Sequence, residues 1–131
     1  MNNGDRLDRA ERLKARTKQF ALRVVKMFKA LPRGEEARIM GRQVLRSGTS
    51  VGANYRAACR ARTANEFISK IRVAVEEADE TGYWLELLVE ALIIGKARLD
   101  PLLAECNELL AILASSQHTA ESRLRRRSMV K

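Results

Sequence analysis

Apolar residues recur at alternating steps of three and four along most of the chain, which is the spacing of one face of an α-helix. Four segments follow this pattern, and they cover about residues 5–31, 35–62, 63–93 and 96–115. Pro32 and Gly34 separate the first two, because proline keeps the preceding residue out of helical backbone and glycine frees the turn. The predicted fold class is therefore all-α, an antiparallel up-and-down four-helix bundle.

The stretch 47–52 in the second segment, Ser-Gly-Thr-Ser-Val-Gly, consists mostly of poor helix formers and resembles a loop by local propensity. The apolar phase nevertheless continues across it, through Val44, Gly48, Val51 and Tyr55. Small side chains let a neighbouring backbone approach closely, so we expect one continuous helix here. A phosphate-binding loop is not expected, because no strand precedes the stretch and no Gly-Lys-Ser/Thr follows it.

The third segment carries two apolar stripes side by side. Thr63 and Glu66 form a predicted capping box at its start. The first stripe is a heptad pattern made of Ala64, Phe67, Ile71, Ala74, Ala78, Thr81, Leu85, Leu88 and Leu92. The second consists of Ile68, Val75, Gly82, Val89 and Ile93. Together they exceed the roughly 100° face of a helix that packs on one side, so we expect this helix to contact more than one neighbour, in its own or in another subunit. The residues expected at an oligomer interface are Ile68, Val75, Trp84 and Val89.

The fourth segment is predicted to begin after Gly95, with Asp100 as the helix N-cap and Pro101 as the first helical residue. Its heptad residues are Leu99, Leu102, Cys106, Leu109 and Leu113. The apolar pattern ends at Ser115, and arginines dominate the remainder. The predicted organisation is therefore a four-helix bundle over 1–115 and a basic, disordered tail over 116–131.

Length and composition narrow the class further. A chain of 131 residues, 46% of them hydrophobic and 31% charged, suits a single hydrophobic core. No apolar run reaches the roughly 20 residues of a membrane span, and the N-terminal stretch lacks the apolar core of a signal peptide. We therefore expect a cytoplasmic protein without membrane contact.

Few residues are arranged for chemistry. Cys59 and Cys106 lack CxxC spacing, and His118 is the only histidine, which argues against a zinc cluster and makes both cysteines candidates for reduced core residues. The third segment has acidic residues without the histidines of a di-metal site: Glu76, Glu77, Asp79, Glu80, Glu86 and Glu90. Of these, Glu76, Asp79, Glu86 and Glu90 lie away from the heptad face, so we read them as a solvated acidic face, available for pairing with arginines of the second segment. We expect no enzyme, no cofactor and no metal.

Charge suggests the partner class. The net charge is +9, of which residues 1–33 contribute +7, while residues 63–97 carry −4. Such a basic surface attracts polyanions over long distances. On a helical wheel of the second segment, five arginines lie within an arc of roughly 80° away from the core: Arg38, Arg42, Arg46, Arg56 and Arg60.

We hypothesise that this arginine ridge contacts the phosphates of RNA or DNA, since guanidiniums match phosphate oxygens. No aromatic residue lies on the ridge, so base stacking is not expected. Two alternatives stay open. The ridge is a solvated face, or it pairs with the acidic face of the third segment in a neighbouring subunit.

Residues 42–88, and above all the runs RSGTSVGANYRAA and EEADETGYWLEL, closely resemble a family of bacterial four-helix-bundle proteins. This family is related to the proteins encoded in intervening sequences of 23S ribosomal RNA genes. The similarity extends more loosely from Phe20 to Leu113. The chain departs from many relatives at Arg56-Ala57-Ala58, where they have Ala-Glu-Gly, so any role of that glutamate is absent here.

The resemblance implies an up-and-down bundle that assembles into a ring-shaped homo-oligomer, typically a pentamer. It also implies likeness in fold and size to the basic, pentameric accessory protein of diversity-generating retroelements, which works with a reverse transcriptase and nucleic acid. It implies no established biochemical activity. The leading hypothesis is a non-enzymatic oligomer that contacts nucleic-acid backbone, and the alternative is a protein-interaction scaffold that binds no nucleic acid.

Overall fold

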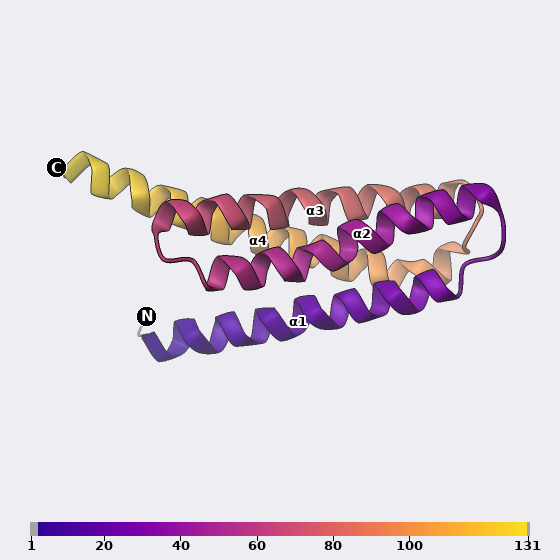
Figure 1. The fold of residues 1–131 in the computed structure, drawn as a ribbon, viewed down its shortest axis with the longest axis horizontal. Coiled ribbons are helices and arrows are strands. Elements are labelled where there is room, and N and C mark those ends of the chain that lie inside the picture. Colours follow the sequence, from indigo (N-terminus) through magenta and orange to yellow (C-terminus); the bar gives the residue numbers. More distant parts are fainter. Residues whose placement is uncertain (1–2, 131) are drawn as a thin grey trace.

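The computed structural model describes residues 3–130, which form four helices and no strands (Figure 1). The helices are α1 (Asn3–Lys29), α2 (Glu35–Cys59), α3 (Ala64–Glu90) and α4 (Lys96–Val130). The α1–α2 and α3–α4 connections lie at one end of the molecule and the α2–α3 connection at the other (Figure 1). The chain therefore runs up and down, as the hydrophobic pattern predicted.

The four helices do not contact one another equally. Helix α2 packs closely on both α1 and α3, and α3 packs on α4. By contrast, α1 has little contact with α4 and none with α3. The bundle is therefore closed on three sides and partly open between α1 and α4.

The predicted heptad residues form most of the core. One cluster, at the end with the α1–α2 and α3–α4 connections, contains Phe20, Val24, Val44, Leu85, Leu88, Leu99, Leu102, Cys106 and Leu109. A second cluster contains Val51, Tyr55, Ile71, Ala74, Ala78 and Leu113. Leu92 is the exception, because α3 ends before it and leaves its side chain 90% exposed.

Helix α2 is continuous across residues 47–52, as predicted. An added Cβ at Gly48 would lie 2.8 Å from Cγ2 of Val24, and one at Gly52 would lie 3.3 Å from the backbone of Thr17. The absent side chains therefore let α1 approach α2 closely. On the α3 side, the hydroxyls of Ser47 and Thr81 are fully buried and lie 2.9 Å apart.

The ends of α3 are set by hydrogen bonds. The Thr63 side chain accepts a bond of 3.0 Å from the Glu66 amide, which confirms Thr63 as the N-cap. The Glu66 carboxylate accepts from the amide of Arg62 rather than from that of Thr63, so the capping box is displaced by one residue. At the other end, Ile93 donates to the Leu88 carbonyl and Leu92 to Val89, which is the pattern of a Schellman motif.

Helix α4 differs from the prediction at its start. The segment starts after Gly95 as predicted, but the helix already begins at Lys96 and Asp100 is not its N-cap, because the Gly95 carbonyl accepts bonds from the amides of Arg98 and Leu99. Pro101 therefore lies inside the helix, not at its first position. Because proline has no amide hydrogen, the Ala97 carbonyl four residues earlier lacks its helical hydrogen bond. Ala97 is exposed, so water can replace that bond.

Helix α4 also differs at its end. Residues 116–130, predicted as a disordered tail, continue the helix and project beyond the bundle (Figure 1). The apolar pattern ends at Ser115 because the core ends at Leu113, whereas the helix continues without needing a buried face. Lys131, the last residue of the predicted tail, lies outside the described residues.

Within residues 3–130, no helix combines the length and hydrophobicity that a bilayer crossing requires.

Candidate nucleic-acid interface

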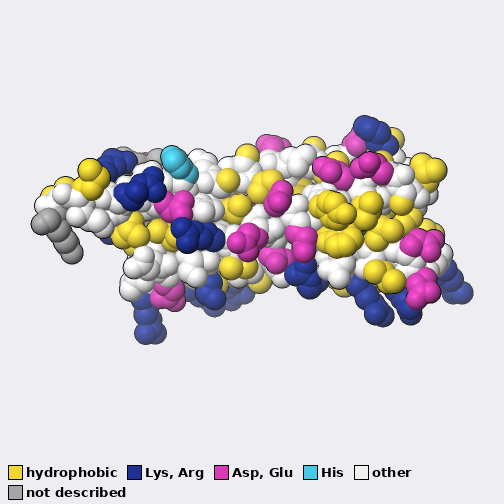
Figure 2. All heavy atoms as spheres, turned by 90° about the horizontal axis from the view of Figure 1, so that it is seen from above, with side chains coloured by type: hydrophobic (Ala, Val, Ile, Leu, Met, Phe, Trp, Pro, Cys, Tyr) yellow, Lys and Arg dark blue, Asp and Glu magenta, His cyan; other side chains and the backbone are white. Residues whose placement is uncertain are grey.

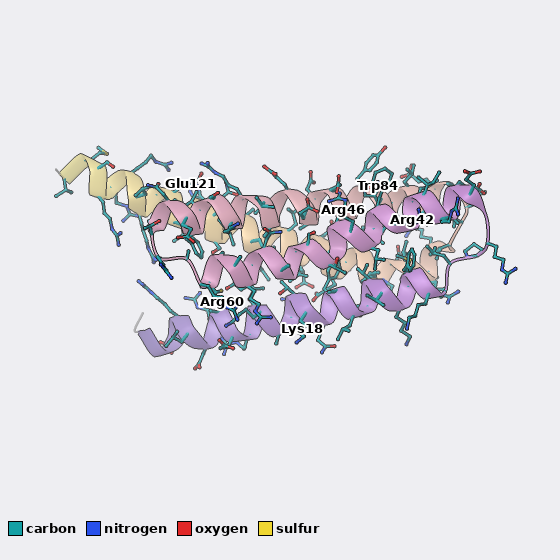
Figure 3. All side chains as sticks on the ribbon, in the orientation of Figure 1. Lys18, Arg42, Arg46, Arg60, Trp84 and Glu121 are labelled. Atoms are coloured by element: carbon teal, nitrogen blue, oxygen red, sulfur yellow. The ribbon has the colours of Figure 1, made fainter. Side chains whose placement is uncertain are left out.

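The five arginines of the predicted ridge are all exposed along α2. Four lie within the helix, and Arg60 is its C-cap residue. Figure 3 shows Arg42, Arg46 and Arg60 on the same face of the molecule, with Lys18 on the neighbouring helix α1. The ridge is therefore present as a surface, and it borders α1.

Arg46 differs from the other members of the ridge because α3 neutralises it. Its Nη1 lies 3.1 Å from Oε2 of Glu77, and its Nη2 pairs with Glu80. An arginine of the second segment thus pairs with the third segment within one chain, but through Glu77 and Glu80 rather than through the predicted acidic face. Among the described residues, none forms an ion pair with the other four: Arg38, Arg42, Arg56 and Arg60.

The unpaired arginines form two groups on α2. Arg38 and Arg42 lie near its start, and Arg56 and Arg60 lie at its end. At 1.5 Å per residue, Arg42 and Arg56 are about 21 Å apart along the helix axis. Two separated basic groups suit contacts to successive parts of one phosphate backbone.

Sequence reasoning about α2 alone missed the contribution of α1. Helix α1 carries nine basic and three acidic side chains, a net charge of +6. Helix α3 carries seven acidic and two basic ones, a net charge of −5. Because α1 does not touch α3, the two charges lie on opposite sides of the bundle. Figure 2 shows acidic side chains on the face that includes α3, with basic ones along its edge.

One arginine of α1 is engaged in structure instead. Arg16 donates from Nε and Nη2 to Glu105 on α4, at 2.8 and 2.6 Å, and its Nη2 also lies 3.3 Å from Glu108. The hydrogen bond to Glu105 raises the pKa of Arg16, and the same bond lowers the pKa of Glu105. This cluster fixes α1 to α4 where the two helices otherwise have little contact.

The expected oligomer-interface residues do not form one accessible stripe. Ile68 is 5% exposed and is therefore already buried by its own chain. Val75, Trp84 and Val89 are half-buried and pack against the core clusters. Trp84 also contacts the exposed Tyr83, with the ring centroids 5.1 Å apart, and its buried Nε1 has no hydrogen-bond partner among the described residues.

The cysteines occupy different environments. The Cys106 thiol is buried, lies 3.2 Å from the Ala78 carbonyl oxygen, and has its pKa raised to about 12 by that burial. Cys59 is only half-buried, so it is not a core residue of the predicted kind. Within residues 3–130, no three His, Cys, Asp or Glu side chains are grouped so that they could hold a metal ion.

Comparison with known proteins places this geometry in context. A family model described as 23S rRNA-intervening sequence protein matches residues 12–115. A crystal structure from Bacteroides thetaiotaomicron VPI-5482, described as a protein with unknown function from the S23 ribosomal protein family, is 36% identical and superposes with a TM-score of 0.78. The match covers 83% of this chain and 97% of that one. No curated protein matches the sequence.

Proposed function

The chain belongs to the 23S rRNA-intervening sequence protein family, and on that premise we propose a non-enzymatic, oligomeric bundle that contacts the backbone of RNA or DNA. The contact surface consists of the unpaired arginines of α2 together with the basic side of α1. The observation that carries the proposal is the segregation of charge, with +6 on α1 and −5 on the helix that does not touch it. A polyanion is attracted to one side of such a molecule and repelled by the other.

The predicted mode of binding is sequence-independent. Arginine forks pair with phosphate oxygens, and no aromatic side chain on the ridge offers a base-stacking platform. Binding through phosphates releases counterions, so the logarithm of the affinity falls by about 0.9 per contact for each tenfold rise in salt.

The test is a salt titration of binding to a generic RNA or DNA duplex, followed by fluorescence anisotropy. We expect steep salt dependence in the native chain, and a slope reduced by about one unit in each of Arg42→Ala and Arg56→Ala. Arg72→Ala is the matched control, because it removes the same charge from α3, where Arg72 pairs with Glu121. Absence of binding at low salt, or equal slopes in all three variants, would contradict the proposal.

The alternative is a protein-interaction scaffold that binds no nucleic acid, and one observation favours it. Tyr83, which contacts the half-buried Trp84, is 57% exposed, and Leu92, just beyond the end of α3, is 90% exposed. Figure 2 shows hydrophobic side chains gathered toward the end of the molecule where α3 joins α4. The same titration separates the two functions, because a pure scaffold shows no duplex binding at low salt.

A further inference from the structure

A groove of about 990 Å³ lies between the first half of α1 and the second half of α4, where the bundle is open. Its floor is formed by α2 and α3 residues, among them Tyr55, Cys59 and Phe67. Its walls are lined by Leu7 and Leu13 of α1 and by Ile112 of α4. Leu7 and Ile112 are 66% and 37% exposed, so the groove presents apolar surface that its own chain leaves uncovered.

The charged residues that line the groove are all basic. Five arginines line it and no acidic residue does, within the described part of the chain: Arg6, Arg9, Arg12, Arg16 and Arg123. Arg16 is held by Glu105, but the guanidiniums of Arg6, Arg12 and Arg123 form no ion pair with any described residue. An apolar floor between cationic flanks complements a ligand with the opposite arrangement, apolar in the middle and acidic at the sides.

The shape of the groove indicates the form of that ligand. Its α4 wall runs from Ala111 to Arg123, which at 1.5 Å per residue is about 18 Å, or three turns of a helix. An amphipathic helix presents apolar residues at i, i+3, i+4 and i+7 on one face, and it docks in a groove by that face. A nucleic-acid backbone would satisfy the arginines but would bury Leu7 and Ile112 against charged phosphates.

We propose that this groove binds an acidic amphipathic α-helix of a partner protein. The apolar face of that helix packs on Leu7, Leu13 and Ile112, and its carboxylates pair with Arg6, Arg12 and Arg123. This surface shares basic residues of α1 with the proposed nucleic-acid contact but includes none of the α2 arginines and adds an apolar floor. The proposal therefore does not depend on nucleic-acid binding.

The test uses the full chain and a synthetic helical peptide of about three to four turns, with leucines at i, i+3, i+4 and i+7 and glutamates elsewhere. Fluorescence anisotropy is expected to show binding that weakens about tenfold, or 1.4 kcal/mol, in Leu7→Lys and in Ile112→Lys. Both side chains are exposed, so the variants should fold. Leu22→Lys is the matched control, since Leu22 is also exposed on α1 and lies outside the groove.

Charge reversal tests the role of the rim. Arg12→Glu should weaken binding of the glutamate peptide and strengthen binding of a lysine version of it. The thiol of Cys59 supplies a second readout, because it lines the groove while Cys106 is 1% exposed. The peptide should slow modification of Cys59 by a disulfide reagent.

Four outcomes would overturn the proposal. The first is a peptide affinity that is unchanged in the groove variants. The second is a rate of Cys59 modification that is the same with and without the peptide. An RNA duplex would protect Cys59 from the reagent, which would identify nucleic acid as the occupant of the groove. The mass of the native assembly would fall in Leu7→Lys, which would identify a second copy of the chain.

Discussion

At the residue scale, the contact between Arg16 and Glu105 illustrates how one pair can fix the position of a whole helix. The Glu105 side chain is 17% exposed, and its carboxylate accepts hydrogen bonds from two nitrogens of the Arg16 guanidinium. Apart from the shared core cluster, little else joins α1 to α4, and pockets lined by both helices lie on either side of the pair. The pair therefore affects both the stability of the bundle and the width of the groove.

Glu105→Gln should lower the free energy of unfolding by about 1 kcal/mol near neutral pH, a modest value because Arg16 is over a third exposed and its charge is screened by water. The pKa of Glu105 is lowered from its ordinary 4.5, so this stabilisation is present above that value. It is lost as the pH falls through the lower pKa of the folded state, where Glu105 becomes protonated.

Urea denaturation at about pH 7 and about pH 3 measures this dependence. The difference between the native chain and Glu105→Gln should shrink at the acidic pH. Glu108→Gln is the control, because its carboxylate is 69% exposed and should contribute little at either pH. An equal difference in the free energy of unfolding at both pH values would mean that Glu105→Gln disturbs packing, and that the loss of the carboxylate charge is not the cause.

At the scale of the helix, small residues explain why α2 lies in the middle of the bundle. Gly48 and Gly52 face α1, and Ser47 faces Thr81 of α3, so both neighbours approach the α2 backbone. The same residues are poor helix formers, so they lower the intrinsic stability of α2 as a helix while they allow close packing. Continuity of α2 could be predicted because the apolar phase is a property of the sequence.

Gly48→Ala and Gly82→Ala should have opposite effects on the melting temperature. A methyl group at Gly48 would lie 2.8 and 3.0 Å from the Cγ atoms of Val24, a stiff β-branched side chain. The cost of overpacking, about 1–3 kcal/mol, exceeds the gain of up to about 1 kcal/mol in helix propensity. At Gly82 the nearest atom is 3.8 Å away, so only the gain remains. Thermal unfolding by circular dichroism compares the two, and an unchanged or higher melting temperature for Gly48→Ala would refute the packing argument.

Other features of the helices could not be predicted from periodicity. The start of α4 depends on bonds to the Gly95 carbonyl, which a local reading of Asp100 and Pro101 does not contain. The neutralisation of Arg46 depends on which turn of α3 lies beside it. The groove depends on the divergence of α1 from α4, and heptad patterns specify which residues are buried but not how far two helices separate.

At the scale of the whole molecule, the exposed end of α3 bears on assembly. Leu92 has φ of 61°, a left-handed conformation that favours glycine, and its side chain is 90% exposed. A large apolar residue in a strained position gains nothing from its own chain. Burial of Leu92 against a second copy would offset this cost, and Tyr83 of α3 is a further exposed apolar side chain available for burial.

Light scattering should therefore give a mass several times the 14.8 kDa of one chain, with five copies expected from the family resemblance. Tyr83→Lys combined with Leu92→Lys should reduce the mass, because two lysines cannot be buried without partners. Leu22→Lys again provides an exposed apolar position elsewhere as control. A mass of one chain for the native protein would exclude this assembly.

The separation of charge between α1 and α3 also gives the molecule a transverse electric dipole, with its positive pole on the α1 side. In the field of a polyanion, this dipole experiences a torque as well as an attraction. The molecule would turn its α1 side toward the polyanion before any side chain touches it, which raises the fraction of productive collisions at low salt. Orientation during the encounter is thus determined by where the charges lie across the bundle, more than by any single arginine.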